Sequence, residues 1–225
     1  MLSELLPERE RTIYLDSDCL CLDHLGELWT TPLLTGVIGA VRDGLTPFAA
    51  GPLGTDWWGL GLPSDSAYFN AGVLLMDLGG MRELDLGGQA CELMRTQALR
   101  WADQCALNIV AHDHWHEIAR RWNVQTADVT GRSLTWALWP ELTAEAVEQP
   151  AILHFTERDK PWHRDSMHPA RDLWRDMQQA TAWPRWSSES RTPWQRLKSR
   201  LAVAAVRPKG SVHHPAKELH DIRKR

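Results

Sequence analysis

Short apolar stretches alternate with polar segments along most of the chain, and polar or small residues stand where the stretches end. Four stretches have the length and composition of β-strands: residues 12–15, 36–41, 68–76 and 151–155. The residues at or near their ends are Asp16, Asp18, Asp43, Asn70, Gly72 and His154. We expect the first stretch to be a buried strand. Because open α/β sheets bind ligands beyond their strand ends, these residues are expected to face a ligand site.

Helical patterns lie between and after these strands. The predicted helical segments are 23–29, 89–101, 103–110, 169–180 and 192–204. Residues 45–63 are rich in glycine and proline and are predicted to form a loop. About the last fifteen residues are predicted to be disordered. Strands that alternate with helices favour an α/β fold.

Charge is distributed unevenly along the chain. The formal net charge is −4, but residues 185–225 hold eleven Lys and Arg residues against three Asp and Glu residues. An acidic body argues against a nucleic-acid-binding core, whereas the basic end permits contact with an anionic surface. We therefore divide the chain into a body over residues 1–182 and a basic, Trp-containing tail over 183–225, partly helical and then disordered.

The small number of cysteines and the short apolar runs indicate where in the cell the protein is expected. The chain has four cysteines and no signal peptide before them, so a cytoplasmic protein without a disulfide framework is expected. Every apolar run is far shorter than the ~20 residues that a membrane-spanning helix needs. In the tail, Trp183, Trp186 and Trp194 lie among arginines, which fits a peripheral membrane helix as well as it fits a solvated extension.

The candidate chemistry begins with Asp16 and Asp18, which lie two residues apart at a predicted strand end, where both carboxylates can reach one cation. Alone, such a pair is more often a solvated strand end. His154 and Lys160 change the picture, because an imidazole beside two carboxylates favours Mn²⁺ over Mg²⁺ and an ammonium group suits a diphosphate. The combination indicates a divalent-metal site for a phosphorylated ligand.

Four segments, in order, carry a resemblance to a known family. Residues 14–18, Tyr-Leu-Asp-Ser-Asp, resemble the Asp-x-Asp strand of family 8 glycosyltransferases, and residues 68–75 resemble the family's Phe-Asn-Ala-Gly strand. Residues 103–108 are similar to its Asp-Gln-x-x-Leu-Asn segment, and residues 154–162 match its His-x(5)-Lys-Pro-Trp signature. Together the segments cover roughly residues 5 to 165 and are highly specific as a set.

This resemblance implies a GT-A fold, the Rossmann-like fold of nucleotide-diphospho-sugar transferases. It also implies a retaining transfer of a hexose from a UDP-sugar to an acceptor, such as lipopolysaccharide, another glycan or a lipid-linked sugar. By position in the motifs, Asp16, Asp18 and His154 would hold Mn²⁺, with Mg²⁺ as the second choice. Lys160 would contact the donor diphosphate.

The resemblance also places residues around the donor sugar. Asp43, Asn70 and Gly72 would face the sugar, and Asp103 would bind its hydroxyls. Gln104 would lie closest to the reacting anomeric carbon. Because a carboxamide is a poor nucleophile, we prefer a same-face reaction, in which the leaving phosphate helps to deprotonate the acceptor, over a double displacement.

Each of these assignments has a structural alternative. Asn70 and Gly72 can mark only a β-bulge, Asp103 can be only a helix N-cap, and Asp43 can end a strand in solvent. The four ordered motifs lead us to prefer the functional assignments.

The sequence departs from the family pattern in two places. No counterpart of the family's opening uridine-binding strand and helix stands before Asp16, so we expect a GT-A fold that lacks its first strands and exposes a sheet edge. The body would then be an N-terminally incomplete catalytic domain. Glu157 occupies a position that is usually glycine in the family, and its bulk and charge are expected to disfavour a nearby diphosphate.

Two other functions stay open at this point. The first is a non-catalytic, truncated remnant of such an enzyme. The second is a metal-binding protein that uses either His112, His114 and His116 or the pair Cys19 and Cys21. Alternate histidines converge only on a strand, and this segment is predicted to be a helix end or loop.

Overall fold

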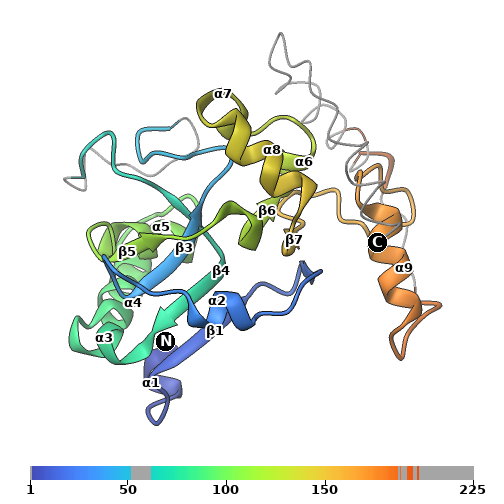
Figure 1. Ribbon diagram of the computed structural model, residues 1–225. Coiled ribbons are helices and arrows are strands. Elements are labelled where there is room, and N and C mark those ends of the chain that lie inside the picture. Colours follow the sequence, from blue (N-terminus) through green and yellow to red (C-terminus); the bar gives the residue numbers. More distant parts are fainter. Residues whose placement is uncertain (1, 52–61, 187, 189–191, 195–196, 198–225) are drawn as a thin grey trace.

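Strands and helices alternate along the part of the chain that the computed structural model describes, which is residues 2–51, 62–186, 188, 192–194 and 197 (Figure 1). The strands are β1 (Arg11–Leu15), β2 (Cys19–Cys21), β3 (Ile38–Arg42), β4 (Phe69–Asp77), β5 (Trp115–Glu117), β6 (Val124–Gln125) and β7 (Ile152–His154). The helices are α1 (Leu2–Leu5), α2 (Gly26–Thr30), α3 (Leu78–Glu83), α4 (Leu86–Thr96), α5 (Ala102–Val110), the 3₁₀ helix η1 (Arg120–Asn123), α6 (Thr126–Val129), α7 (Thr135–Leu138), α8 (Pro140–Glu148) and α9 (Arg171–Gln179).

The four predicted strands are all present, as β1, β3, β4 and β7. Some boundaries differ from the prediction. The predicted helix over 89–101 ends at Thr96, and Asp103 lies in the first turn of α5, whose N-cap is Trp101. The segment around His116, predicted to be a helix end or loop, contains strand β5. Strands of two or three residues, such as β2, β5 and β6, are too short for their own periodicity to reveal them.

The larger sheet has the strand order β1-β4-β3-β5. Strand β4 runs antiparallel to both β1 and β3, whereas β5 runs parallel to β3. Strands β1 and β3 therefore share a direction, and their carboxyl ends meet the beginning of β4 at one edge of the sheet. This arrangement brings the residues that follow Leu15 and Arg42 close to Asn70 and Gly72.

A smaller sheet has the order β2-β7-β6, with β7 antiparallel to β2 and parallel to β6. Residues 16–18 cross from β1 in the larger sheet to β2 in the smaller one. Cys19 pairs with His154 in the β2–β7 register, so the central strand β7 carries His154 to the point of crossing.

A β-bulge interrupts the pairing of β3 with β4. Ala40 pairs with Leu74, but Val41 pairs with Asn70, so residues 71–73 have no partner on β3. Strand β1 follows this bulged segment, since Leu15 pairs with Val73 and the amide of Asp16 donates to the carbonyl of Gly72 at 2.8 Å. The bulge anticipated at Asn70 and Gly72 is therefore real, and it lies within the candidate site.

Both faces of strand β4 are buried. Leu74 and Met76 face a cluster that includes residues of α3, α4 and α5, while Val73 and Leu75 face a second cluster with Trp122 and Ile152. A strand buried on two faces has a near-continuous apolar sequence, as residues 71–76 have. In Figure 1, α3, α4 and α5 gather at one end of the molecule and α9 lies at the other.

The prediction of a buried first strand is wrong, because all residues of β1 are only half-buried. This strand stands last in the strand order of the larger sheet and pairs with β4 alone among the described residues. No helix in the described ranges is long and apolar enough to cross a membrane. The predicted helix over 192–204 falls mostly outside those ranges, and of its residues that are described, Trp194 and Leu197 are exposed.

Candidate active site

The crossing from β1 to β2 brings two carboxylates against a buried imidazole. His154 Nε2 lies 3.2 Å from Asp18 Oδ1 and 3.5 Å from Asp16 Oδ2. Lys160, in the loop after β7, places its Nζ 2.6 Å from Asp18 Oδ2 and also donates to the carbonyl of Phe155. We name Asp16, Asp18, His154 and Lys160 the metal-side cluster. The prediction that these four residues converge is met in the geometry, whereas their roles stay predictions.

The electrostatics of this cluster favour ionised carboxylates. Burial alone would raise the pKa of Asp18, but hydrogen bonds from His154 and Lys160 hold it well below the usual range. The hydrogen bond from His154 likewise lowers the pKa of Asp16. Burial alone would lower the pKa of His154, but the two carboxylates raise it above the ordinary value. The carboxylates therefore stay available to a cation across the neutral range.

Tyr14 supports Asp16 from the strand itself. Its hydroxyl donates to Asp16 Oδ1 at 2.8 Å, and this hydrogen bond is the main reason that the pKa of Tyr14 is raised to about 12. The negative charge of Asp103 adds to that rise, so this exposed residue at the start of α5 faces the same region. Tyr14 thus orients one of the carboxylates, a role that was not assigned from the sequence.

Gly72 allows the close approach of β4 to this cluster. A Cβ atom at position 72 would lie 2.7 Å from His154 Nδ1 and 2.8 Å from Asp16 Oδ2, and it would also overlap His154 Cε1. Contacts this short do not occur for real Cβ atoms, so any side chain here would displace the imidazole or the carboxylate. The glycine is explained by packing against His154, independently of any sugar.

The donor atoms fit a divalent cation. Among the described residues, the three side chains whose ligand atoms lie within 4.8 Å of one another are Asp18, Cys19 and His154. Cys19 was expected as a ligand only together with Cys21. Its thiol lies 3.7 Å from the carbonyl of Gly72, and burial raises its pKa. The other two members, the carboxylate of Asp18 and the imidazole of His154, suit Mn²⁺ or Mg²⁺ better than a soft metal. Asp16 is outside this group, although its Oδ2 lies 3.5 Å from His154 Nε2.

The three histidines of the alternative metal site do not come together among the described residues. In the ranges that the structure covers, His112, His114 and His116 form no group of ligand atoms within that distance. His112 instead contacts the carboxylate of Asp113 at 2.9 Å, and His116 contacts the hydroxyl of Thr35 at 3.2 Å. Cys19 and Cys21 are free thiols.

A second polar cluster lies at the same sheet edge and contains Asp43, Asn70 and Gln104. Asn70 Nδ2 donates to Asp43 Oδ2 and to Gln104 Oε1, both at 3.2 Å, and Gln104 Nε2 lies 3.4 Å from Asp43 Oδ2. The amide of Ala71, in the bulge, donates to Gln104 Oε1 at 3.1 Å. Burial raises the pKa of Asp43 above its ordinary value, although the hydrogen bonds that its carboxylate accepts act to lower it. We name these three residues the sugar-side cluster, after their predicted role.

The structure changes the expectation for Glu157. Its carboxylate pairs with Arg132, a guanidinium that is only 6% exposed and that also donates to Thr130 Oγ1 at 3.0 Å. The charge that was expected to repel a diphosphate is therefore matched by a cation within the fold. The expectation was based on position 157 alone. Its partner, Arg132, lies 25 residues earlier and could not be identified from the sequence around Glu157.

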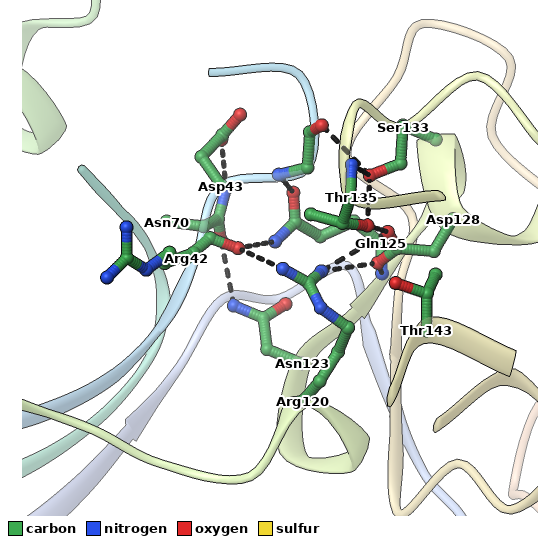
Figure 2. Close-up of polar contacts among 12 residues, drawn as sticks. Arg42, Asp43, Asn70, Arg120, Asn123, Gln125, Asp128, Ser133, Thr135 and Thr143 are labelled. Atoms are coloured by element: carbon green, nitrogen blue, oxygen red, sulfur yellow. Dashed lines mark hydrogen bonds and ion pairs between the residues drawn. The ribbon is translucent and has the colours of Figure 1, made fainter. Parts of the chain in front are cut away.

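Asn123 connects the two clusters and was missed from the sequence. Its Nδ2 donates to Asn70 Oδ1 at 2.9 Å, and its Oδ1 lies 3.0 Å from His154 Nδ1. The side chain is completely buried. In Figure 2 it extends from the chain beside Arg120 toward Asn70 and Asp43. A polar residue between Trp122 and Val124, both apolar and both buried, is the one signal that could have identified it.

Comparisons with known proteins identify the family that the chain resembles. A family model described as "Glycosyl transferase family 8" matches residues 1–166. General stress protein A of Bacillus subtilis is 28% identical over 179 residues, covering 77% of this chain and 60% of that protein. Lipopolysaccharide 1,3-galactosyltransferase of Salmonella typhimurium is 24% identical over 184 residues, covering 77% of this chain and 50% of that protein.

A solved structure of the galactosyltransferase LgtC, with donor and acceptor sugar analogues, matches with a TM-score of 0.64 at 23% identity. The match covers 88% of this chain and 68% of that one. A match at that identity establishes the fold, which is GT-A, in agreement with the prediction. The chain spans less than two thirds of the length of the two relatives named above.

Proposed function

The chain belongs to glycosyltransferase family 8, and we propose that it is a metal-dependent retaining hexosyltransferase that uses a UDP-sugar donor. One observation carries the proposal: Asp16, Asp18, His154 and Lys160, which are far apart in sequence, converge beside the cluster of Asp43, Asn70 and Gln104. One half supplies ligands for a cation and a diphosphate, and the other supplies hydrogen-bonding groups for a sugar.

In the metal-side cluster, Asp16, Asp18 and His154 would hold Mn²⁺, with Mg²⁺ as the alternative. A divalent cation bound there would neutralise charge on the departing diphosphate. Lys160 would add a second positive charge, because its ammonium group already lies 2.6 Å from Asp18 Oδ2. Tyr14 keeps Asp16 oriented through its hydroxyl. Together these residues would favour cleavage of the bond between the anomeric carbon and the phosphate.

In the sugar-side cluster, Asp43, Asn70 and exposed Asp103 would bind sugar hydroxyls, and the backbone at Gly72 would approach the donor. Gln104 is held on both ends of its carboxamide, since Oε1 accepts from Asn70 and from the amide of Ala71 while Nε2 faces Asp43. A carboxamide held this way can position a sugar or stabilise developing positive charge through its oxygen, but it is a weak nucleophile. We therefore infer a same-face reaction, in which the leaving phosphate accepts the acceptor's proton.

The acceptor is proposed to be a glycan or a lipid-linked sugar, lipopolysaccharide among them, because one relative is named for that substrate. A cytoplasmic location is proposed for the protein, and peripheral membrane contact is proposed for its tail. The exposed Trp183 and Trp186 after α9 support this contact, and residues 185–225 carry a net charge of +8. Sedimentation with phosphatidylglycerol vesicles, with neutral phosphatidylcholine vesicles as the control, tests it. Absence of binding to both would exclude the contact.

The first test of the enzymatic proposal is binding of UDP by calorimetry, with and without Mn²⁺, on the wild type and on Asp18→Ala. We expect binding that requires both Mn²⁺ and Asp18. Asp23→Ala is the matched control, because Asp23 also pairs with a basic residue, Arg121 at 2.7 Å, but lies outside the cluster. If a folded wild-type chain binds no UDP with Mn²⁺, the proposal fails and a non-catalytic role for the chain is favoured. If binding is found, turnover of UDP-hexoses identifies the donor.

A further inference from the structure

Asn123 ends η1 and lies between the metal-side and sugar-side clusters. It touches both through one carboxamide, with Nδ2 at 2.9 Å from Asn70 Oδ1 and Oδ1 at 3.0 Å from His154 Nδ1. The side chain has no exposed surface, so water cannot replace either contact. Both contacts therefore have to be made in the correct donor-to-acceptor sense.

The sense of the contacts follows from a backbone amide. The N–H of Gly72, which can only donate, points at Asn70 Oδ1 at 3.1 Å. On the other side of Asn70, its Nδ2 donates to Asp43 Oδ2, whose carboxyl also accepts from the amides of Leu45 and Thr46. The carboxamide of Asn70 therefore has one allowed orientation, with its oxygen toward Asn123.

That orientation determines the state of the next two groups. Since Asn70 presents an oxygen, Asn123 has to present its NH₂ group to Asn70, and its own oxygen then faces His154 Nδ1. An oxygen 3.0 Å away requires a proton on Nδ1. The other ring nitrogen, Nε2, is the atom that faces Asp16 and Asp18. A chain of hydrogen bonds from Gly72 through Asn70 and Asn123 thus keeps a proton on Nδ1, so that a cation bound at the carboxylates would displace only the proton on Nε2.

We propose that Asn123 is a positioning residue: it fixes the proton of His154 on Nδ1, so that Nε2 serves as the metal ligand, and through Asn70 it ties the metal side to the sugar side. The inference rests on the proposed role of His154 as a metal ligand. Polar groups that hold the far nitrogen of a ligating histidine commonly change metal affinity by about 10- to 100-fold when they are removed.

The direct test is ¹⁵N NMR of the histidine rings, in the metal-free protein and with Zn²⁺ as a diamagnetic probe. The signal of His154 is identified by its loss in His154→Gln. We expect Nδ1 to carry a proton in both states of the wild type, with slow exchange because the ring is 4% exposed. An unprotonated Nδ1 in the wild type would overturn the proposal without the need for any variant.

The second test is the affinity for Mn²⁺ alone, measured by electron paramagnetic resonance. We expect about 10- to 100-fold weaker binding in Asn123→Leu, which cannot accept from Nδ1. The loss should be smaller in Asn123→Asp, which can accept from Nδ1 but cannot donate to Asn70 Oδ1. Asn108→Leu is the matched control. Asn108 is also a buried asparagine with three hydrogen bonds, but its partners are the backbone of Phe69 and Gln104.

These experiments separate the two levels of inference. A wild type that binds no Mn²⁺ would contradict the proposed function, while the NMR result would still report on the hydrogen-bond chain. A wild type that binds Mn²⁺ with the same affinity as both Asn123 variants would contradict the positioning role alone. Equal losses in Asn123→Leu and Asn108→Leu would show that loss of stability, rather than the contact to His154, causes the effect, and this would also overturn the proposal.

Discussion

Two groups of charged side chains in this protein are built differently. In the first, Asp128 is fully buried and accepts from Arg120 through both oxygens, from the amide of Gln125 and from the hydroxyl of Thr135 (Figure 2). Arg120 also donates to the carbonyl of Arg42. In the second, the metal-side cluster, the side chain of Asp16 is 40% exposed. We name the first group the Asp128 cluster.

The difference separates a structural ion pair from a candidate binding site. The carboxylate of Asp128 has its accepting positions filled from within the fold, so it has nothing left to offer a ligand. The carboxylates of Asp16 and Asp18 are held ionised by a histidine and a lysine, but their side chains stay 40% and 20% exposed. Burial with complete pairing indicates a role in the fold, whereas partial pairing at a strand end indicates a role toward a ligand.

The largest effect is expected from Asp128→Ala. Removing one partner of a buried pair leaves Arg120 with an uncompensated charge at 10% exposure, and the cost is typically about 3–5 kcal/mol. Urea denaturation followed by circular dichroism measures the change in the free energy of unfolding. A loss below about 1 kcal/mol would mean that the two clusters do not differ in structural importance.

A smaller effect, in pH dependence, is expected from His168, which is buried without a charged hydrogen-bond partner. Its Nδ1 accepts from the amide of Ala170, its Nε2 contacts Thr126 Oγ1, and burial lowers its pKa to about 4. Because the folded pKa lies below the unfolded value of about 6.5, the unfolded chain binds more protons between these two values, and stability falls as the pH falls.

We expect the titration of His168 to lower the free energy of unfolding by about 2 kcal/mol between pH 7.5 and pH 4.5. Chemical denaturation at several pH values measures it. The variant His168→Phe has no group to titrate and should lose this part of the pH dependence. An unchanged slope in the variant would assign the pH dependence to other groups, the metal-side cluster first among them.

The next effect concerns Asp16→Asn, which keeps the shape of the side chain and removes its charge. Affinity for Mn²⁺ should fall about tenfold, because one charged ligand is lost. The free energy of unfolding should change by less than about 1 kcal/mol, since the residue is partly exposed. Titration with Mn²⁺ and urea denaturation on the same preparations compare the two quantities. A large loss of stability with intact binding would reverse the distinction between the clusters.

The smallest effect is expected from Lys160→Met. The ammonium group of Lys160 lies 2.6 Å from Asp18 Oδ2 and therefore competes with a cation for that oxygen. Without nucleotide, the variant should bind Mn²⁺ about two- to fivefold more tightly, in line with the strength of partly exposed ion pairs. In the presence of Mn²⁺, it should bind UDP more weakly. Tighter or weaker binding of both ligands would contradict the expected opposite effects of Lys160 on the cation and on the nucleotide.

The sequence alone determined which strands carry the candidate site. Apolar stretches that end in Asp16, Asp43 and His154 became β1, β3 and β7, because a buried strand needs a continuous apolar run and a polar end marks where it leaves the core. The ordered motifs determined the family and the GT-A fold. These signals are local, and each can be read from a stretch of fewer than ten residues.

Only the tertiary structure decided which hydrogen bonds connect the strand ends and which partners balance the charges beside them. The bulge between Asn70 and Leu74, the pairing of Glu157 with Arg132, and the contact of Asn123 with His154 all depend on strand register or on partners 25 or more residues apart. A hydrogen bond between distant segments leaves no periodic pattern in either one, because only the folded chain brings the partners together. For that reason the contacts of Asn123 could not be assigned until the two clusters that it connects were placed in space.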